Sequence, residues 1–179
     1  RAMKGEIDLF EQAKQLVEEL QERADRPVTL KNYYEEKLDY INNFKNAILM
    51  VMGVASEKFK RKFVFEQEIW LNIADMMMFL YAGESTTLRI QKLEILKENN
   101  EEDLDSLNIY KDMLDILVYD SAAEIRKAGA DAINSFTMGQ ERLLLLDSLD
   151  KFTRVAPVNV KEKRRKIADY LIEENKYKF

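Results

Sequence analysis

The sequence predicts an all-α protein, an antiparallel helical bundle of four main helices with short flanking helices. Only 5 of its 179 residues are glycine and only 2 are proline, whereas Lys, Arg, Asp and Glu together make up 34%. Turn-forming residues are therefore scarce and good helix formers dominate. The apolar residues, 46% of the chain, recur at steps of three and four, as they do along one face of a helix.

The length suits one domain with a substantial core and is short for two. We divide this single domain into residues 1–26, an N-terminal amphipathic helix with a connection from an upstream domain, and residues 27–179, the bundle. The chain opens with RAMKGEIDLF, which is neither a signal peptide nor a natural leader. We therefore expect it to be a piece of a longer protein.

The first two helices follow from apolar spacing. Apolar side chains predict a first helix that ends before Pro27, namely Leu9, Ala13, Leu16 and Leu20. A second helix is expected from about Thr29 to Lys62, with an apolar second half that includes Phe44, Ile48 and Met52.

The third helix is expected to include the run FEQEIWLNIADMMMFLYAGESTTLRIQKL (65–93) and to extend to about Asn99. Its seam follows alternating steps of four and three: Ile69, Ile73, Met76, Leu80, Gly83, Thr87 and Ile90. A neighbouring stripe widens the apolar arc: Trp70, Ala74, Met77, Tyr81 and Leu88. Such an arc predicts contacts with two or three other helices. We interpret the methionine run 76–78 as core packing, with a ligand groove as the alternative.

Three further helices complete the bundle. Residues 98–102 form a polar turn, with Asp103 or a neighbour as the cap of a fourth helix that fades near Asn134. Thr137 or Ser135 is expected to cap a leucine-rich fifth helix that extends through Leu149. A short sixth helix is expected from Lys161 to about Glu174.

The composition excludes several kinds of site. The chain has no histidine and no cysteine, so it offers neither an imidazole base nor a thiolate. A ferritin-like di-iron site needs Glu-x-x-His pairs, which a chain without histidine cannot supply. A pair of carboxylates acting as general acid and base would need a cleft and a defined separation, and the spacing of carboxylates along a helix does not indicate either. We therefore predict no catalytic, cofactor-binding or metal-ligating residue in this chain. The longest wholly apolar run, residues 47–55, is about half a membrane span, and a net charge of −5 gives no general attraction to nucleic acid.

Charged residues within the apolar helices are candidates for buried ion pairs. We expect Asp75 and Glu84 to lie near the edge of the apolar arc and to pair with a basic residue of an adjacent helix. Arg126 is the best placed by register. Such a pair would specify register more than it would add stability.

Two basic clusters remain. The first is residues 58–62, KFKRK, and the second starts the last helix, with Lys161, Lys163, Arg164, Arg165 and Lys166. Each could bind phosphate, a coenzyme A diphosphate or acidic lipid headgroups, and the second is a possible anion or partner surface. The alternative is a solvated helix face, with the first cluster also favoured at a helix C-terminus.

Three stretches of the chain resemble a known family. RAMKGEIDLF, FEQEIWLNIADMMMFLYAGESTTLRIQKL and PVNVKEKRRKIADYLIEENKYKF look like the C-terminal extension of acyl-CoA dehydrogenases of the very-long-chain type, especially bacterial ones. The middle stretch carries the family's E-Q-E followed by Y-A-x-E-S-x-x-L-R, here Glu66-Gln67-Glu68 and Tyr81 through Arg89. None of these residues is a catalytic signature of that family.

The resemblance implies a non-catalytic helical bundle that packs on the catalytic core of its parent enzyme or on another partner. The parent would oxidise the α,β bond of an acyl-CoA in fatty-acid β-oxidation, with FAD bound in the core and none in this chain. It would be bacterial and cytoplasmic, at most peripheral to a membrane. Self-association is a further expectation. The alternatives are an independent helical binding module and a membrane-surface anchor, which the acidic polar side of the first helix disfavours.

Overall fold

The computed structural model describes residues 32–97 and 104–174. These residues form α2 (Tyr33–Phe59), the 3-10 helix η2 (Lys60–Phe65), α3 (Gln67–Lys97), α4 (Leu104–Phe136), α5 (Gly139–Phe152) and α6 (Val160–Glu174). Within these ranges the regular structure is all helical, which confirms the predicted fold class. The predicted first helix and the predicted turn with its Asp103 cap lie outside the described residues.

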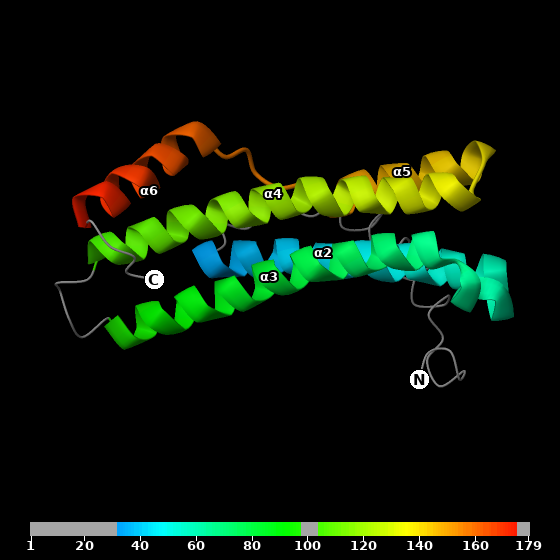
Figure 1. Ribbon diagram of the computed structural model, residues 1–179, viewed down its shortest axis with the longest axis horizontal. Helices are drawn as coiled ribbons and strands as arrows, with labels where there is room; N and C mark the ends of the chain where they lie inside the picture. Colours follow the sequence, from blue (N-terminus) through cyan, green and yellow to red (C-terminus); the bar gives the residue numbers. More distant parts are fainter. Residues whose placement is uncertain (1–31, 98–103, 175–179) are drawn as a thin grey trace.

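The long helices α2, α3 and α4 run antiparallel, each returning along the one before it (Figure 1). Helix α5 packs against α4 and α2, whereas α6 lies along the other half of α4. The fourth position of the bundle is thus filled by the shorter α5, and α6 is the flanking helix.

Side-chain caps set the start of two helices. The Asn32 side chain accepts hydrogen bonds from the Tyr34 and Glu35 amides, and the Glu35 carboxylate accepts one from the Asn32 amide at 3.1 Å, so that Asn32 and Glu35 form a capping box. Asn159 caps α6 in a similar way through Glu162. The Asn159 cap explains why the predicted start of the sixth helix is correct to within one residue.

Helix α2 ends at Phe59, before the predicted Lys62, because Lys60 adopts a positive φ of 50°. The chain continues through η2, which is fastened to the start of α3. The Trp70 indole donates a hydrogen bond to the Phe63 carbonyl at 2.9 Å, and the two rings stack with centroids 4.6 Å apart. This contact fixes the turn between α2 and α3.

The predicted cap of the fifth helix is wrong. Ser135 and Thr137 donate their hydroxyl hydrogens backwards, to the carbonyls of Ala132 and Ile133. They therefore satisfy carbonyl groups at the end of α4. Met138 stands at the N-cap of α5 and makes no side-chain cap.

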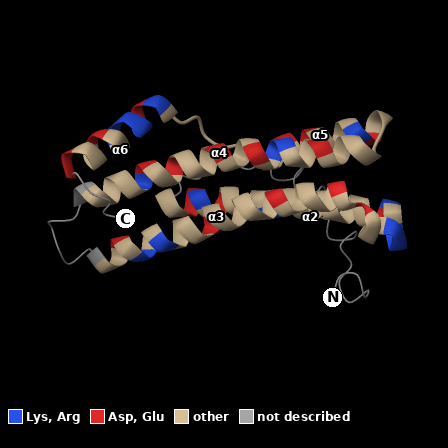
Figure 2. Cartoon of the chain, viewed as in Figure 1, with Lys and Arg blue, Asp and Glu red and all other residues tan. Residues whose placement is uncertain are grey.

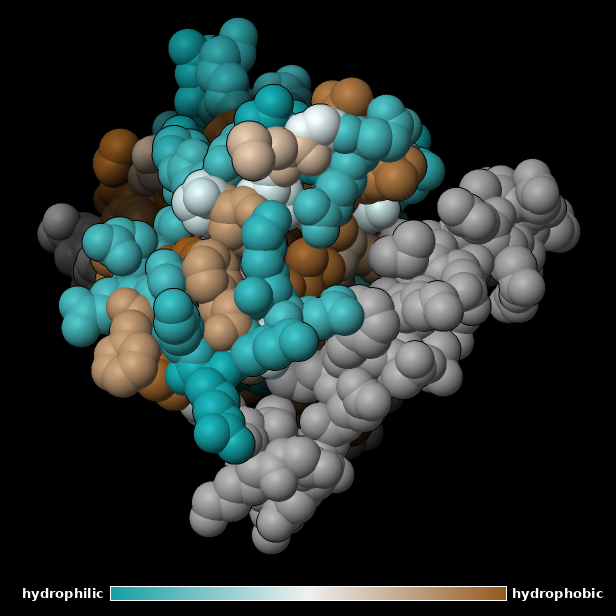
Figure 3. Space-filling model, turned by 90° about the vertical axis from the view of Figure 1, so that its right-hand side faces the viewer, coloured by the Kyte–Doolittle hydropathy of each residue, from teal (hydrophilic) through white to brown (hydrophobic). Residues whose placement is uncertain are grey.

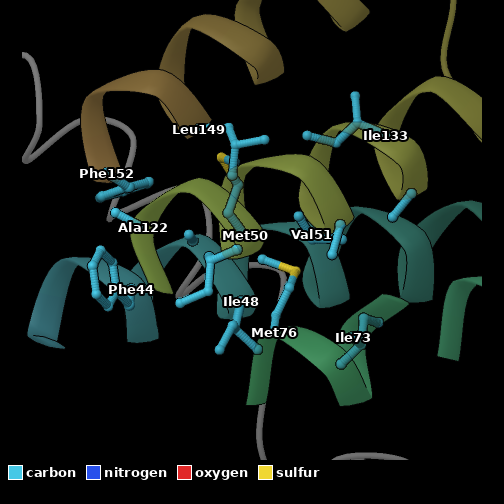
Figure 4. Packing of buried hydrophobic residues seen from close by; sticks show 14 of the residues in the cluster. Phe44, Ile48, Met50, Val51, Ile73, Met76, Ala122, Ile133, Leu149 and Phe152 are labelled. Carbon is cyan, nitrogen blue, oxygen red and sulfur yellow. The ribbon is translucent and has the colours of Figure 1, made fainter. Parts of the chain in front are cut away.

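The core lies where the predicted seam of α3 meets the other helices. Figure 4 shows side chains from α2, α3, α4 and α5 converging on one cluster, with Met50 and Met76 near its middle. Six of the seven predicted seam positions are buried, and Leu80 is half-buried. The predicted second stripe is not buried. Trp70 is partly covered, and the other four residues of the stripe are exposed: Ala74, Met77, Tyr81 and Leu88.

Candidate interaction surface

Helix α3 presents an uncharged outer face. We define the outer α3 face by its five large apolar residues, Leu71, Met77, Met78, Tyr81 and Leu88, which are 50–73% exposed. The small residues Ala74 and Ser85 fill the other exposed positions between Leu71 and Leu88. Core packing is therefore the correct interpretation for Met76 only, and not for the two methionines that follow it.

This face differs from the exposed surface of the neighbouring helices. The exposed positions of α4 include Glu124, Arg126, Lys127 and Asp131. Helix α6 carries basic residues at its start and acidic residues at its end (Figure 2). Large exposed apolar patches on a protein surface mark interaction sites, which makes the outer α3 face the candidate interaction surface of this chain.

The predicted ion pair between α3 and Arg126 does not form. Glu84 pairs with Lys45 of α2, whose ammonium lies 2.5 Å from Oε1. Arg126 is exposed and pairs with Asp150 of α5 at 2.6 Å. Asp75 makes no ion pair with the described part of the chain. Glu84 thus has a basic partner on an adjacent helix, as expected, but that partner is on α2.

The basic cluster of α6 divides into two groups. Lys163 forms ion pairs with Asp112 and Asp115 of α4, the second at 2.9 Å, and Arg164 pairs with Asp120 at 3.1 Å. These two residues hold α6 on α4. The other three are exposed, and within the described residues they make no ion pair: Lys161, Arg165 and Lys166.

A buried charge network lies where α2, α4 and α6 meet. The Lys37 ammonium is 2.7 Å from Oδ1 of Asp115, and the Tyr33 hydroxyl donates to the same oxygen at 3.0 Å. Burial alone would raise the pKa of Asp115, but hydrogen bonds from Lys37 and Lys163 outweigh it and hold the pKa below its usual value. Burial, and then the Asp115 charge, raise the pKa of Tyr33 above its usual range.

Sequence reasoning missed this network, although a signal was present. Lys37 stands in the apolar seam of α2, at helical spacing between Tyr34 and Ile41. A lysine in such a seam must either extend to water or find a carboxylate. Because each acidic group of the network is occupied by cations of the same chain, we assign it a structural role.

Two properties of the described residues bear on other functions. Among residues 32–97 and 104–174, no group of three acidic residues is placed to hold a metal ion. None of the described helices is both long and apolar enough to cross a membrane.

Comparison with known proteins agrees with the helical architecture. Residues 43–151, from within α2 almost to the end of α5, match the family described as acyl-CoA dehydrogenase, C-terminal domain. A probable acyl-CoA dehydrogenase of Bacillus subtilis (strain 168) is 32% identical over 99% of the chain, which spans 29% of the length of that relative.

A solved structure adds the fold. The crystal structure of acyl-CoA dehydrogenase complexed with FAD from Bacillus anthracis matches with a TM-score of 0.81 and 32% identity. The match covers 99% of this chain and 29% of that one. The family match extends over more than half of the chain and agrees with the residues that carry the resemblance. The chain therefore belongs to the acyl-CoA dehydrogenase C-terminal domain family.

Proposed function

We propose that the chain is the non-catalytic C-terminal helical part of a larger FAD-dependent acyl-CoA dehydrogenase, and that it packs against the catalytic part of that enzyme. One observation carries the proposal. The similarity to the Bacillus anthracis enzyme extends over nearly all of this chain but only 29% of that one. The rest of such an enzyme would supply the flavin site, the acyl-CoA site and the base.

The described residues support a structural role. The buried Lys37 is paired with Asp115, and the chain offers no histidine or cysteine for acid–base or nucleophilic chemistry. The enzyme would oxidise an acyl-CoA at the α,β bond in fatty-acid β-oxidation. Membership of the very-long-chain type and a bacterial cytoplasmic location are also part of this proposal, and they rest on the resemblance of the sequence.

The proposal is tested by comparing the purified 179-residue chain with the longer enzyme to which it belongs. We expect the longer enzyme to hold FAD and to reduce an electron acceptor with acyl-CoA, and the 179-residue chain to do neither. A flavin absorption spectrum in the purified chain would contradict the proposal, as would acceptor reduction.

A peripheral membrane anchor is the second candidate function. It is favoured by η2, where Val64 and the 77% exposed Phe65 follow the basic residues 60–62. Figure 3 views this end of the bundle, where hydrophobic patches lie among hydrophilic side chains. Co-sedimentation with vesicles of acidic lipid, with Phe65→Ser as the variant, tests this function. Binding that survives the substitution would exclude η2 as the anchor.

A further inference from the structure

We propose that the outer α3 face is the surface on which the catalytic part of the enzyme docks. This inference rests on the proposed function and adds to it the contact face. Over the 18 residues from Leu71 to Leu88, the exposed positions of α3 carry no charge, in a chain that is 34% charged. Burial of this face against another protein would remove large apolar side chains from water, and Glu84, the partly exposed carboxylate next to the face, already has Lys45 as its counter-ion.

The size and composition of the face suit a protein interface. Leu71 and Leu88 are about 26 Å apart along the helix axis, at about 1.5 Å per residue. Tyr81, near the middle and 73% exposed, offers a large ring and a hydroxyl, and tyrosine is enriched among the residues that dominate binding energy. Charged residues are depleted at the centre of such interfaces and frequent at the rim. Here Glu68, Arg89 and Lys92 are exposed charged residues of α3 beyond the two ends of the face.

The exposed apolar residues within α5 and α6 fit this role less well. On α5, Leu143 and Leu144 are 60% and 59% exposed, but Glu141, Asp147 and Asp150 are exposed on the same helix. On α6, Ile172 is exposed between Asp169 and Glu173. An apolar partner would have to desolvate these carboxylates, which costs free energy unless each is matched by a cation.

The length of the Bacillus anthracis enzyme indicates which partner covers the outer α3 face. The Bacillus anthracis enzyme has 71% of its chain outside the matched part, since the match covers 29% of it. A partner within the same polypeptide is present at high effective concentration and loses less translational and rotational freedom on docking. A second copy of the bundle has no such advantage. We therefore assign the face to the catalytic part, whose matching surface is expected to be apolar and free of charge.

The test uses the longer enzyme with a specific protease site inserted between Arg26 and Pro27. After cleavage, gel filtration reports whether the helical part stays with the flavoprotein. We expect the unsubstituted enzyme to remain associated and Tyr81→Lys to weaken the association by a factor of about 30 or more, as for a central interface residue. The matched control is Leu143→Lys, an exposed apolar residue of α5 that should leave the association unchanged. Lysine is a good helix former, so neither change should unfold its helix.

The outcomes separate the inference from the proposed function. If the unsubstituted parts separate after cleavage, packing on the catalytic part is contradicted and the inference fails with it. If they remain associated and Tyr81→Lys has no effect, packing stands and the assignment of the face is overturned. If the unsubstituted enzyme self-associates, and Tyr81→Lys abolishes this self-association while the flavoprotein contact is kept, the face belongs to a second copy and the assignment is overturned.

Methionine oxidation in the uncleaved enzyme gives an independent readout. Met77 and Met78 of the face should be at least about tenfold less reactive toward peroxide than Met138, which is 80% exposed at the start of α5. Equal reactivity of the three methionines would overturn the inference without a substitution that could disturb folding.

Discussion

The ammonium of Lys37 lies 2.7 Å from a carboxylate oxygen of Asp115, and the two side chains are only 9% and 15% exposed. The pair joins α2 to α4, and Lys163 extends it to α6. The Lys37 ammonium also lies 4.9 Å from the centre of the Tyr33 ring, within the range of a cation–π contact. One carboxylate thus ties together three helices that are far apart in the sequence.

Substitution of Asp115 is expected to be costly. Asp115→Asn removes the negative charge and leaves Lys37 buried without a counter-ion, so we expect the free energy of unfolding to fall by about 3 kcal/mol. The control is Asp150→Asn, which breaks the exposed pair with Arg126 and should cost at most about 1 kcal/mol. Urea denaturation of both variants measures the difference. Equal, small losses would mean that water reaches Lys37.

The same carboxylate gives an acid dependence. The pKa of Asp115 is held below its usual value of 3.8 in the folded protein, so the folded state releases this proton more readily than the unfolded state. The stabilisation is therefore complete above pH about 4 and is lost as the pH falls through the lower, folded pKa. Below pH about 4 the free energy of unfolding should fall more steeply in the unsubstituted protein than in Asp115→Asn. Parallel curves would exclude Asp115 as the titrating group.

Helix α6 should depend on one lysine. Lys163→Gln removes the ion pairs with Asp112 and Asp115, whereas Arg165→Gln changes an exposed residue of the same helix. Because hydrogen bonds between charged groups contribute about 1.5–3 kcal/mol, we expect amide hydrogen exchange in α6 to accelerate roughly tenfold or more in Lys163→Gln only. A similar acceleration in Arg165→Gln would show that the overall positive charge of α6, and not the ion pairs of Lys163, holds α6 against α4.

Anion binding by the start of α6 is then a separate question. With Lys163 and Arg164 engaged by α4, the part of the predicted anion or partner surface still available is Lys161, Arg165 and Lys166. A test of that surface should change these three to glutamine and leave Lys163 in place, so that loss of binding is not confused with release of α6.

The sequence predicted the positions of the helices better than it predicted which helix faces are buried. The spacing of Ile69, Ile73 and Met76 indicates a buried seam because burial follows the helical period, and these three residues are buried. The stripe through Met77 and Tyr81 has the same period but is exposed. Its burial could not be predicted, because periodicity shows that a helix face is apolar but does not show what covers that face. A family resemblance could suggest a partner for the bundle, but it could not locate the contact face.

The ion pairs were harder to predict for a related reason. Glu84 pairs with Lys45, and Arg126 with Asp150, and both choices depend on the rotation of each helix about its axis. A rotation of one residue, about 100°, changes the partner. Ser135 and Thr137 illustrate a similar ambiguity, because their hydroxyl groups can either cap the next helix or bond back to the previous turn.

Two glycines within helices should respond in opposite ways to alanine. At Gly83 of α3, an added Cβ would meet no atom within 4 Å, so Gly83→Ala should gain about 0.5–1 kcal/mol of stability from helix propensity. At Gly129 of α4, the Cβ would lie 2.9 Å from a methyl carbon of Leu149 and 3.2 Å from Cε of Met76. Overpacking costs about 1–3 kcal/mol, so Gly129→Ala should be destabilising by about 1 kcal/mol after the gain in propensity. Thermal or urea denaturation of the two variants measures both effects. An equal gain at both positions would show that Leu149 and Met76 can move aside, and that the contact between α3, α4 and α5 is looser than its burial indicates.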